Sequence, residues 1–375
     1  MHVPAAGDRV SEDGIPARCD VLHVVWAGYY GGIQTQLATL VRAFDVRPGA
    51  THRVCFLEGS GPIADSLVDE GLAFRLGFRR GWDPRDLRRF ARSLRQSRPS
   101  VIHVHSPVLA TALVATSGRE ATCVFTQHGL RTERQNRIFY RLVRRRFARF
   151  LVVAPVLTSR LEGYGVEADR IGHLPLPLTV PPRTVPDSAG SNGSRVVGIV
   201  ARLEREKRVD VFIDVIAALG ANGADCAGVI VGDGSQRPDL EERVKSRGLD
   251  GRVRLVGIQE DHLEWLDGFD VCLMTSDQDV YPLIALEAMA RGVPLVAMPC
   301  DGGLPDLATR GGLLLADRDP TNAAAALIGL FDSSERRAAL RARGAAVAAQ
   351  HALENVIPLY EAFYESLRRR EESAG

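Results

Sequence analysis

The sequence predicts an α/β protein built from two doubly wound domains that face each other across a cleft. Three observations support this prediction. The chain has 375 residues, whereas single hydrophobic cores rarely grow beyond about 250–300 residues. Short apolar, β-rich runs alternate with amphipathic helical patterns from end to end, which is typical of a parallel sheet with helices on both faces. A proline-rich segment interrupts this alternation near the middle of the chain.

That segment, 175–194, reads "PLPLTVPPRTVPDSAGSNGS" and holds five prolines followed by a Ser/Gly/Asn run. It cannot sustain a helix or a central strand, so we predict a linker. Ligands bind such sheets at the carboxyl ends of the strands, which places the predicted cleft between the domains. The predicted parts are a loose tail at 1–19, a first domain at 20–180, a linker at 181–194, a second domain at 195–352 and a final helix at 353–375 that packs back on the body through Leu359, Phe363 and Leu367.

Each domain is predicted to contain its own series of strands. In the first series they are "DVLHVVWA" (20–27), "HRVCFLE" (52–58), "VIHVHS" (101–106), "CVFTQHG" (123–129) and "FLVVAP" (150–155). In the second series they are "RVVGIVA" (195–201), "AGVIVGDG" (227–234), "RVRLVGI" (252–258), "DVCLMTS" (270–276) and "VPLVAMP" (293–299), with helices predicted at 208–220, 237–247 and 261–267.

Composition limits the class of partner and the compartment. The formal net charge of +1 gives no reason to expect a nucleic-acid partner. The six cysteines are scattered without a C-x-x-C pair, which indicates reduced thiols and a cytoplasmic protein. No run reaches the roughly 18–20 apolar residues of a membrane span, and the first residues lack the apolar block of a signal peptide.

The stretch "DQDVYPLIALEAMARG" (277–292) predicts a helix that begins right after Asp279. Pro282 suits the first helical position and Gly292 the residue just past the end. The open N–H groups of Leu283 and Ile284 would then favour an anion, phosphate above all.

Glu287 lies about one turn further along this helix, and its side chain leans toward the same terminus. A carboxylate that accepts hydrogen bonds from two adjacent hydroxyls suits a ribose diol. The alternative is a capping acid at Asp279 and a partly exposed glutamate. We predict no metal site, because the second aspartate of "DQD" is used at the helix start and metal binding needs converging oxygens.

Two basic residues follow the first strand of the second domain, in "VARLEREKRVD" (200–210). Arg202 and Lys207 stand at a strand end, where a ligand lies in such a sheet. A guanidinium fork and a compact ammonium are suitable partners for a diphosphate. The alternative is a pair of solvated surface bases, although Lys207 and Lys245 are the only lysines of the chain.

Glycines and histidines mark the strand ends of the first domain. Gly31 and Gly32, in "GYYGGIQTQ", allow backbone N–H groups to approach a ligand closely, but the G-x-G-x-x-G spacing of a dinucleotide site is absent. His105 and His128 follow two strands, in "HVHS" and "TQHG". Both fall at strand ends that face the predicted cleft, and of the two we select His128 as a site residue; the alternative for each is a structural role.

The ordered set of these pieces resembles the retaining GT-B glycosyltransferases of family four, group 1, and the resemblance spans nearly the whole chain after the tail. The family's second domain reads roughly G-R-L with a lysine five residues after the arginine, V-G-D-G, V-x-F-x-G, two glutamates eight positions apart followed by A-M-A, G-x-P-V-V, G-G-x-P-E and G-L-L. This chain has, in that order, "ARLEREK", "VGDGSQRPDL", "VRLVGI", "DVYPLIALEAMARGVPLVA", "DGGLPDL" and "GGLLLADRDP".

The resemblance implies two Rossmann-like domains. It also implies transfer of a hexose-type sugar from a nucleoside diphosphate, UDP by preference, to an acceptor hydroxyl of a glycolipid, polysaccharide or natural product. The anomeric configuration would be retained, and no metal or other cofactor would be needed. It also implies roles for single residues. Glu287 would hold the ribose and Asp279 the sugar hydroxyls; Arg202, Lys207, Gly32 and the amides of Leu283 and Ile284 would bind the diphosphate, His128 would lie near the sugar, and the backbone at Ile258 would meet the base.

Two positions depart from the family pattern, namely Asp279, where the family usually has glutamate, and Asp306, in place of the last acid of G-G-x-P-E. The shorter reach of Asp279 keeps one rival function open, a non-catalytic nucleotide-sugar-binding partner of another enzyme. A GT-B nucleotide-sugar epimerase is a second rival, but the sequence does not identify the extra acids and bases that it needs at the sugar ring.

Two segments of the first domain are dense in arginine. Eight arginines accompany two aspartates in 79–98, and eight accompany one glutamate in 131–149. The second segment has an apolar face, so a basic amphipathic helix at 131–150 could contact an anionic membrane. The alternative is an ordinary helix packed on the sheet. The residues of this face are Phe139, Leu142, Val143, Phe147 and Phe150.

Overall fold

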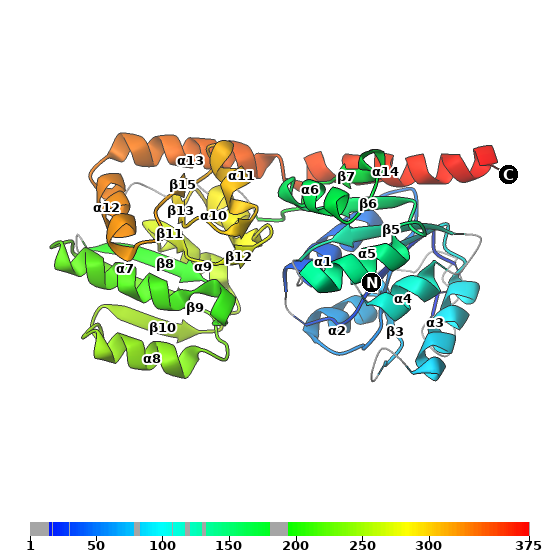
Figure 1. Cartoon of the computed structure of the whole chain (residues 1–375), viewed down its shortest axis with the longest axis horizontal. Helices are drawn as coiled ribbons and strands as arrows, with labels where there is room; N and C mark the ends of the chain where they lie inside the picture. The colour runs from blue at the N-terminus through cyan, green and yellow to red at the C-terminus, as the bar shows by residue number, and fades with distance from the viewer. Residues whose placement is uncertain are drawn as a thin grey trace. The chain divides into compact units, whose positions relative to one another are not determined.

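The structure is a computed structural model of the chain, and it divides into two compact units (Figure 1). Unit 1 comprises Met1–Pro177 and Leu353–Gly375, and unit 2 comprises Leu178–Ala352. The residues that the structure describes are 15–16, 18–29, 31–78, 83–106, 108–116, 121–129, 133–180 and 194–374. Most of the predicted tail and all of the predicted linker except Ser194 therefore lie outside the described residues.

Unit 1 is built on a parallel sheet of seven strands in the order β3-β2-β1-β4-β5-β6-β7. The order reverses between β1 and β4, which pair directly. The strands are β1 (Val21–Val25), β2 (His52–Phe56), β3 (Ala73–Arg75), β4 (Val101–Val104), β5 (Thr122–Gln127), β6 (Arg149–Val152) and β7 (Ile171–His173). The helices are α1 (Gly32–Asp45), α2 (Pro62–Asp69), α3 (Pro84–Ser97), α4 (Leu109–Ala115), α5 (Glu133–Val143), α6 (Val156–Gly163), the 3-10 turn η1 (Ala168–Arg170) and α14 (Leu353–Ala374).

Unit 2 contains a second parallel sheet, in the order β10-β9-β8-β11-β13-β15, and a small two-stranded sheet of β12 and β14. The strands are β8 (Arg195–Val200), β9 (Cys226–Val231), β10 (Val253–Gly257), β11 (Val271–Met274), β12 (Gln278–Asp279), β13 (Leu295–Ala297), β14 (Asp301–Gly302) and β15 (Leu314–Leu315). The helices are the 3-10 turn η2 (Arg205–Lys207), α7 (Val209–Ala221), α8 (Arg237–Ser246), α9 (His262–Asp267), α10 (Leu283–Arg291), α11 (Leu304–Thr309), α12 (Pro320–Phe331) and α13 (Ser334–Ala349).

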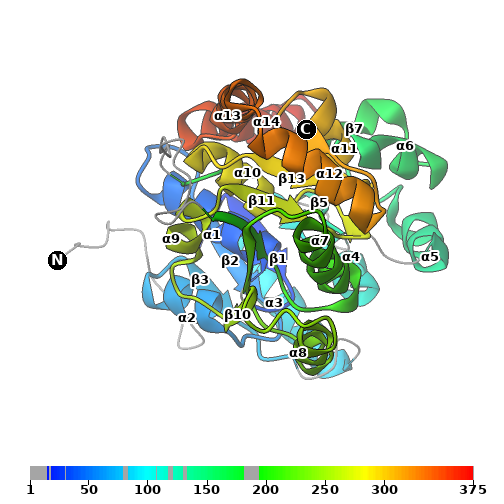
Figure 2. The ribbon, with the colours of Figure 1, turned by 90° about the vertical axis from the view of Figure 1, so that its left-hand side faces the viewer.

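Each unit is a doubly wound layer structure, which confirms the predicted fold class. Figure 2 shows α7, α8 and α12 on one side of the unit 2 sheet and α9 and α10 on the other. Helices on both faces require central strands that are apolar throughout. The strands meet this requirement, since every residue of β1 and of β11 is buried.

The final helix packs on unit 1 through two of the three predicted residues, because Leu367 is buried and Phe363 packs against the same core. In α14, Leu359 is 47% exposed, so its predicted contact is wrong. The buried residues follow the 3.6-residue helical period more closely than the predicted spacing of four does. They are Val356, Ile357, Tyr360, Tyr364 and Leu367. The start of unit 1 is also packed, because Ile15 and Cys19, within the predicted tail, are buried.

The predicted apolar face at 131–150 belongs to the core of unit 1. Four of its five residues, Phe139, Val143, Phe147 and Phe150, are buried, and all but Val143 contact the Phe125 ring. Helix α5 also ends at Val143, before the last arginines of the segment. These four side chains are therefore not available to a membrane.

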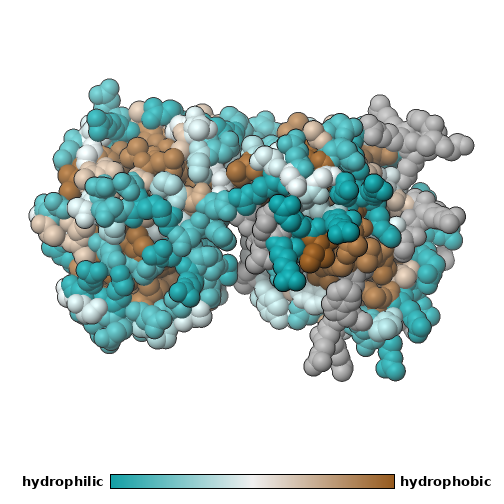
Figure 3. Space-filling model, viewed as in Figure 1, coloured by the Kyte–Doolittle hydropathy of each residue, from teal (hydrophilic) through white to brown (hydrophobic). Residues whose placement is uncertain are grey.

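A smaller apolar surface remains on α5. Ile138 and Leu142 are 50% and 48% exposed, and Figure 3 shows apolar atoms gathered where α4 and α5 lie. Among the described residues, no helix is both long enough and apolar enough to cross a membrane.

Candidate active site

The candidate site of unit 2 is formed by the loops that follow β8 and β11, which are neighbours at the point where the strand order reverses. Ligands of doubly wound sheets bind at this position. Hydrogen bonds hold the two loops together. The Asp277 N–H donates to the Glu206 carbonyl (2.8 Å), and the Thr275 hydroxyl donates to the Lys207 carbonyl (2.9 Å).

The structure brings Lys207 and Asp279 into direct contact across these loops. The Lys207 Nζ lies 2.6 Å from the Asp279 Oδ2, and the two side chains are only 18% and 12% exposed. The Ser276 hydroxyl donates to the same carboxylate oxygen at 3.4 Å. The Lys207 ammonium is largely enclosed and has one carboxylate as its ion-pair partner. A bound anion such as a phosphate can replace that partner.

Arg202 lies on the solvent side of the same loop. Its side chain is 65% exposed and pairs with Glu206 at 2.9 Å. An exposed ion pair of this kind contributes little to stability. The guanidinium can therefore turn toward a ligand at small cost.

Asp279 does not occupy the place that the sequence suggested. It lies in β12, which pairs with β14, three residues before Pro282. The expectation that this aspartate is used at the helix start is wrong, because its carboxylate bonds Lys207 and Ser276. Pro282 is the N-cap of α10, and the helix proper begins at Leu283.

Helix α10 presents its first N–H groups at this edge of the sheet. The N–H groups of Leu283 and Ile284 belong to the first turn and have no acceptor within the helix. The positive end of the helix dipole favours an anion there. At the other end, Gly292 ends the helix with a φ of +73°, as the sequence predicted.

Glu287 is held by a residue that the sequence analysis missed. Its Oε2 lies 2.8 Å from the Nε2 of His262, the first residue of α9. This hydrogen bond raises the pKa of His262 above its usual value, against a smaller lowering by burial. The sequence carries no signal for the contact, because 25 residues separate the partners.

Replacing Glu287 by glutamine should lower the pKa of His262 toward its ordinary value of about 6.5. The amide carries no charge and cannot favour the imidazolium form. An NMR titration of the His262 ring would measure the change. An unchanged pKa of His262 would contradict the hydrogen bond between His262 and Glu287.

The small sheet that carries Asp279 depends on a glycine. Gly302 pairs with Asp279 and has a φ of +155°. A Cβ at this position would lie 1.8 Å from the Asp279 carbonyl oxygen. Only glycine fits without moving the backbone that positions the Lys207 partner.

Gly302→Ala should therefore destabilise unit 2 by about 1–3 kcal/mol, as overpacking generally does. Urea unfolding would measure the loss. Gly251→Ala is the matched control, because a Cβ there meets nothing within 4 Å. Equal stability of the two variants would show that the backbone of β14 shifts to accommodate the Cβ without a measurable loss of stability.

The remaining predicted residue of unit 2 is Ile258, which directly follows β10. It is 76% exposed. Unit 2 thus holds seven of the predicted site residues: Arg202, Lys207, Ile258, Asp279, Leu283, Ile284 and Glu287.

Gly31, Gly32 and His128 belong to unit 1. Gly31 is the N-cap of α1, with an extended φ of −178° that any residue adopts, and Gly32 is the first helical residue. His128 follows β5 and is half-buried, and its Nε2 lies 2.9 Å from the Nδ1 of His105. Burial lowers the pKa of His128 to about 3, which leaves its imidazole neutral at physiological pH.

Two family models match the chain. The one described as Glycosyl transferases group 1 matches residues 194–333, and Glycosyltransferase Family 4 matches residues 30–178. Two curated relatives are the lipopolysaccharide core biosynthesis mannosyltransferase LpsB of Rhizobium meliloti, 31% identical over 47% of this chain and 52% of the relative, and the alpha-D-kanosaminyltransferase of Streptomyces kanamyceticus, 33% identical over 30% of each. The chain thus spans about half the length of these relatives or less.

Solved structures share the fold over nearly the whole chain. HepE of Anabaena, in complex with UDP-glucose, is 17% identical with a TM-score of 0.79, covering 93% of this chain and 100% of HepE. Sucrose-phosphate synthase of Thermosynechococcus elongatus is 18% identical with a TM-score of 0.75, covering 93% and 99%. The chain therefore has the GT-B fold. With the two family models, which together match more than half of it, the chain belongs to the group 1 glycosyltransferases of family four.

Proposed function

We propose that this protein transfers a sugar from a nucleoside diphosphate to an acceptor hydroxyl. The observation that carries the proposal is the Lys207–Asp279 pair at the reversal point of the unit 2 sheet, 2.6 Å apart and largely enclosed. Arg202 lies on the same loop. Together these groups offer two cations for a diphosphate and one carboxylate for sugar hydroxyls. The complex of HepE with UDP-glucose shows that this fold accepts such a donor.

The positive charge would act on the leaving group. As the bond between sugar and phosphate breaks, negative charge grows on the diphosphate, and fixed cations and N–H groups stabilise it. Lys207, Arg202 and the first turn of α10 are the groups assigned to this task. They supply positive charge from the chain itself, so we propose a reaction that needs no metal.

Asp279 and Glu287 would hold the hydroxyl groups of the donor. When a phosphate takes over the Lys207 ammonium, the Asp279 carboxylate is released toward the sugar. Aspartate reaches Lys207 despite its shorter side chain, because its Oδ2 lies 2.6 Å from the ammonium. Glu287, oriented by His262, is assigned to the ribose diol, and the backbone at Ile258 to the base.

The configuration of the sugar would be retained. Asp279 is assigned to the sugar hydroxyls rather than to covalent attack, so attack of the acceptor on the same face as the departing phosphate is the proposed course. Gly31, Gly32 and His128 are proposed to serve the reaction from unit 1. UDP is the proposed nucleotide, in line with the UDP-glucose complex of HepE.

A thermal-shift panel with UDP, GDP, ADP and dTDP, each with and without magnesium, tests the proposal. A ligand at about 100 times its Kd should add about 2.7 kcal/mol of stability. We expect UDP to stabilise the protein equally with and without the metal. Stabilisation that requires magnesium would reject the metal-independent site, and no response to any diphosphate would reject the donor class.

A further inference from the structure

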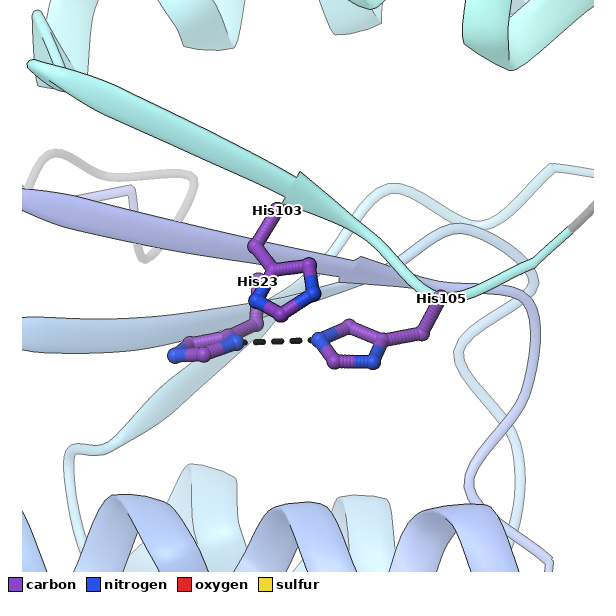
Figure 4. A group of neighbouring side chains, drawn as sticks. All are labelled: His23, His103 and His105. Carbon is purple, nitrogen blue, oxygen red and sulfur yellow. Dashed lines mark hydrogen bonds between the residues drawn. The ribbon is translucent and has the colours of Figure 1, made fainter. Parts of the chain in front are cut away.

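Five histidines of unit 1 lie along neighbouring strands, from the first residue of β2 to the loop after β5. His23 lies on β1, His52 on β2 and His103 on β4, while His105 and His128 follow β4 and β5. His23 and His103 are paired across the sheet. Figure 4 shows the rings of His23, His103 and His105 on the same side of these strands.

Four of these rings form one continuous chain of hydrogen bonds. The His52 Nδ1 lies 3.1 Å from the His23 Nε2, and the His23 Nδ1 lies 3.0 Å from the His105 Nε2. The His105 Nδ1 lies 2.9 Å from the His128 Nε2. Every link thus joins the Nδ1 of one ring to the Nε2 of the next. We call His52, His23, His105 and His128 the imidazole chain.

The rings of the imidazole chain are neutral. Burial is the largest cause that lowers the pKa of each, to about 3 for His52 and His128 and well below the usual range for His23 and His105. The histidines also lower one another's pKa by repulsion, as His103 does for His52 and His105.

Only two proton arrangements satisfy three such links between four neutral rings. A neutral imidazole has one N–H donor and one acceptor nitrogen. If His52 donates from Nδ1, each following ring must accept at Nε2 and donate from Nδ1. If His52 accepts at Nδ1, each following ring must donate from Nε2. All four rings therefore carry their proton on the same kind of nitrogen.

The cluster could instead be a metal site, because nitrogens of His23, His103 and His105 lie within 4.8 Å of one another. The hydrogen bonds argue against this. His103 bonds the Tyr364 hydroxyl through Nδ1 and the Thr126 hydroxyl through Nε2, at 2.8 and 2.5 Å. Both nitrogens of His23 and both of His105 are engaged within the imidazole chain. No lone pair of the three rings is left over for a cation.

We propose that His52, His23 and His105 are positioning residues that hold His128 in a single tautomer and so decide whether its Nδ1 donates or accepts a hydrogen bond at the reacting sugar. The Nδ1 is the His128 nitrogen that the imidazole chain leaves unused. A lone neutral histidine could present either form, whereas a buried linked one cannot change without all four. The role in sugar transfer rests on the proposed function; the shared tautomer does not.

The ring nitrogens of histidine-labelled protein, read by long-range 1H–15N NMR at pH 7, test the proposal directly. We expect the four rings to show one common tautomer. Rings of mixed tautomer, or a charged ring among the four, would overturn the proposal. This measurement uses the unaltered protein and needs no assay of sugar transfer.

Variants then test the coupling. His105→Phe and His23→Phe should each reduce the tautomer preference of His128 by about tenfold or more, because each removes buried hydrogen bonds of the chain. His103→Phe is the matched control. His103 is equally buried and contacts the His105 ring, but it is not a member of the imidazole chain. The NMR signals of His128 should therefore not change in this variant. A His128 tautomer unmoved by His23→Phe, which does not contact His128, would overturn the proposal.

Sugar transfer separates this proposal from the proposed function. His23→Phe should lower kcat by about tenfold or more, in the range of a lost proton-transfer contribution, and leave the KM for the donor unchanged. A common tautomer together with full activity of His128→Ala would reject the assigned role of His128 and leave donor binding by unit 2 standing. A rise in Tm with Zn²⁺ alone, abolished by His23→Phe, would overturn the imidazole chain in favour of a metal site.

Discussion

Lys207→Ala is expected to lower kcat for sugar transfer by about 10²–10³-fold, the usual effect of removing one fixed group that stabilises developing negative charge. The Lys207 ammonium is largely enclosed, with Asp279 as its partner at 2.6 Å. Enclosure strengthens its field at a bound phosphate relative to that of a cation in water. Arg202, which is 65% exposed, should contribute less than Lys207 does.

The chain provides a matched control for this experiment. Lys245 is the only other lysine and lies exposed on α8, so Lys245→Ala should keep full activity. Steady-state kinetics with a labelled donor would measure both variants. Turnover of Lys207→Ala within a few-fold of the unaltered protein would reject the assigned role of the ammonium.

A loss of folding could imitate the expected result. Lys207→Ala leaves the Asp279 carboxylate poorly solvated and without its cation, and breaking such a buried pair can cost about 3–5 kcal/mol. The double variant Lys207→Ala/Asp279→Asn removes that charge. If the double variant melts like the unaltered protein and is less active than Asp279→Asn alone, the additional loss is due to the missing ammonium and lies in catalysis.

The fold could be read from the sequence because its elements depend on local patterns. Fully apolar runs such as Val271–Met274 predict strands buried on both faces, and the structure confirms this one. The predicted helices at 208–220 and 237–247 agree with α7 and α8 within one residue at each end. Helix α5 was predicted too long, because the arginines that continue its pattern to Arg149 also suit a turn and the start of β6.

For the site, the sequence predicts residue types but not contacts. Lys207 and Asp279 were assigned to one ligand, but nothing in the sequence shows that they pair with each other across 72 residues. The contact of His262 with Glu287, and the linkage of His128 to His52, likewise depend on how loops and strands meet in space. Propensity and periodicity describe neighbours along the chain, whereas these contacts are set by strand order and register.

Unit 1 is expected to lose stability steeply as the pH falls below about 6.5, the ordinary pKa of histidine in an unfolded chain. His23, His52, His103, His105 and His128 are buried or half-buried, and burial lowers the pKa of each far below that value. Between the two pKa values the unfolded chain binds a proton at each histidine and the native unit does not. The stability that these neutral histidines contribute is therefore fully present above the pKa of histidine in the unfolded chain, and it is lost as the pH falls below that pKa.

The size of the effect follows from the number of protons. Each histidine costs up to about 1.4 kcal/mol per pH unit, so five together cost up to about 7 kcal/mol per pH unit. Summed from pH 6.5 down to pH 5, the loss is about 10 kcal/mol, so a domain in the lower half of the usual range of about 5–15 kcal/mol would unfold before the pH reaches about 5. Tyr364 does not counteract this loss, because burial raises the pKa of its hydroxyl and keeps it neutral.

Urea unfolding at a series of pH values, read by pulsed hydrogen exchange and mass spectrometry, would follow the two units separately. Amides of β1 and β4 should lose protection at lower urea as the pH falls from 7 to 5. His262 in unit 2 should act in the opposite direction, because its pKa is raised in the native state. Its stabilising contribution is complete below the unfolded pKa and disappears as the pH rises through the folded one.

The slope itself identifies the cause. His103→Phe removes one buried titrating ring and should reduce the dependence of unit 1 on pH by up to about 1.4 kcal/mol per unit, whatever it does to stability at pH 7. A general effect of acid on carboxylates would leave that slope unchanged. If the stability of unit 1 stays constant between pH 7 and 5, the rings are already charged in the native state. Charged rings cannot form the links of the imidazole chain, so this result would also contradict the shared tautomer.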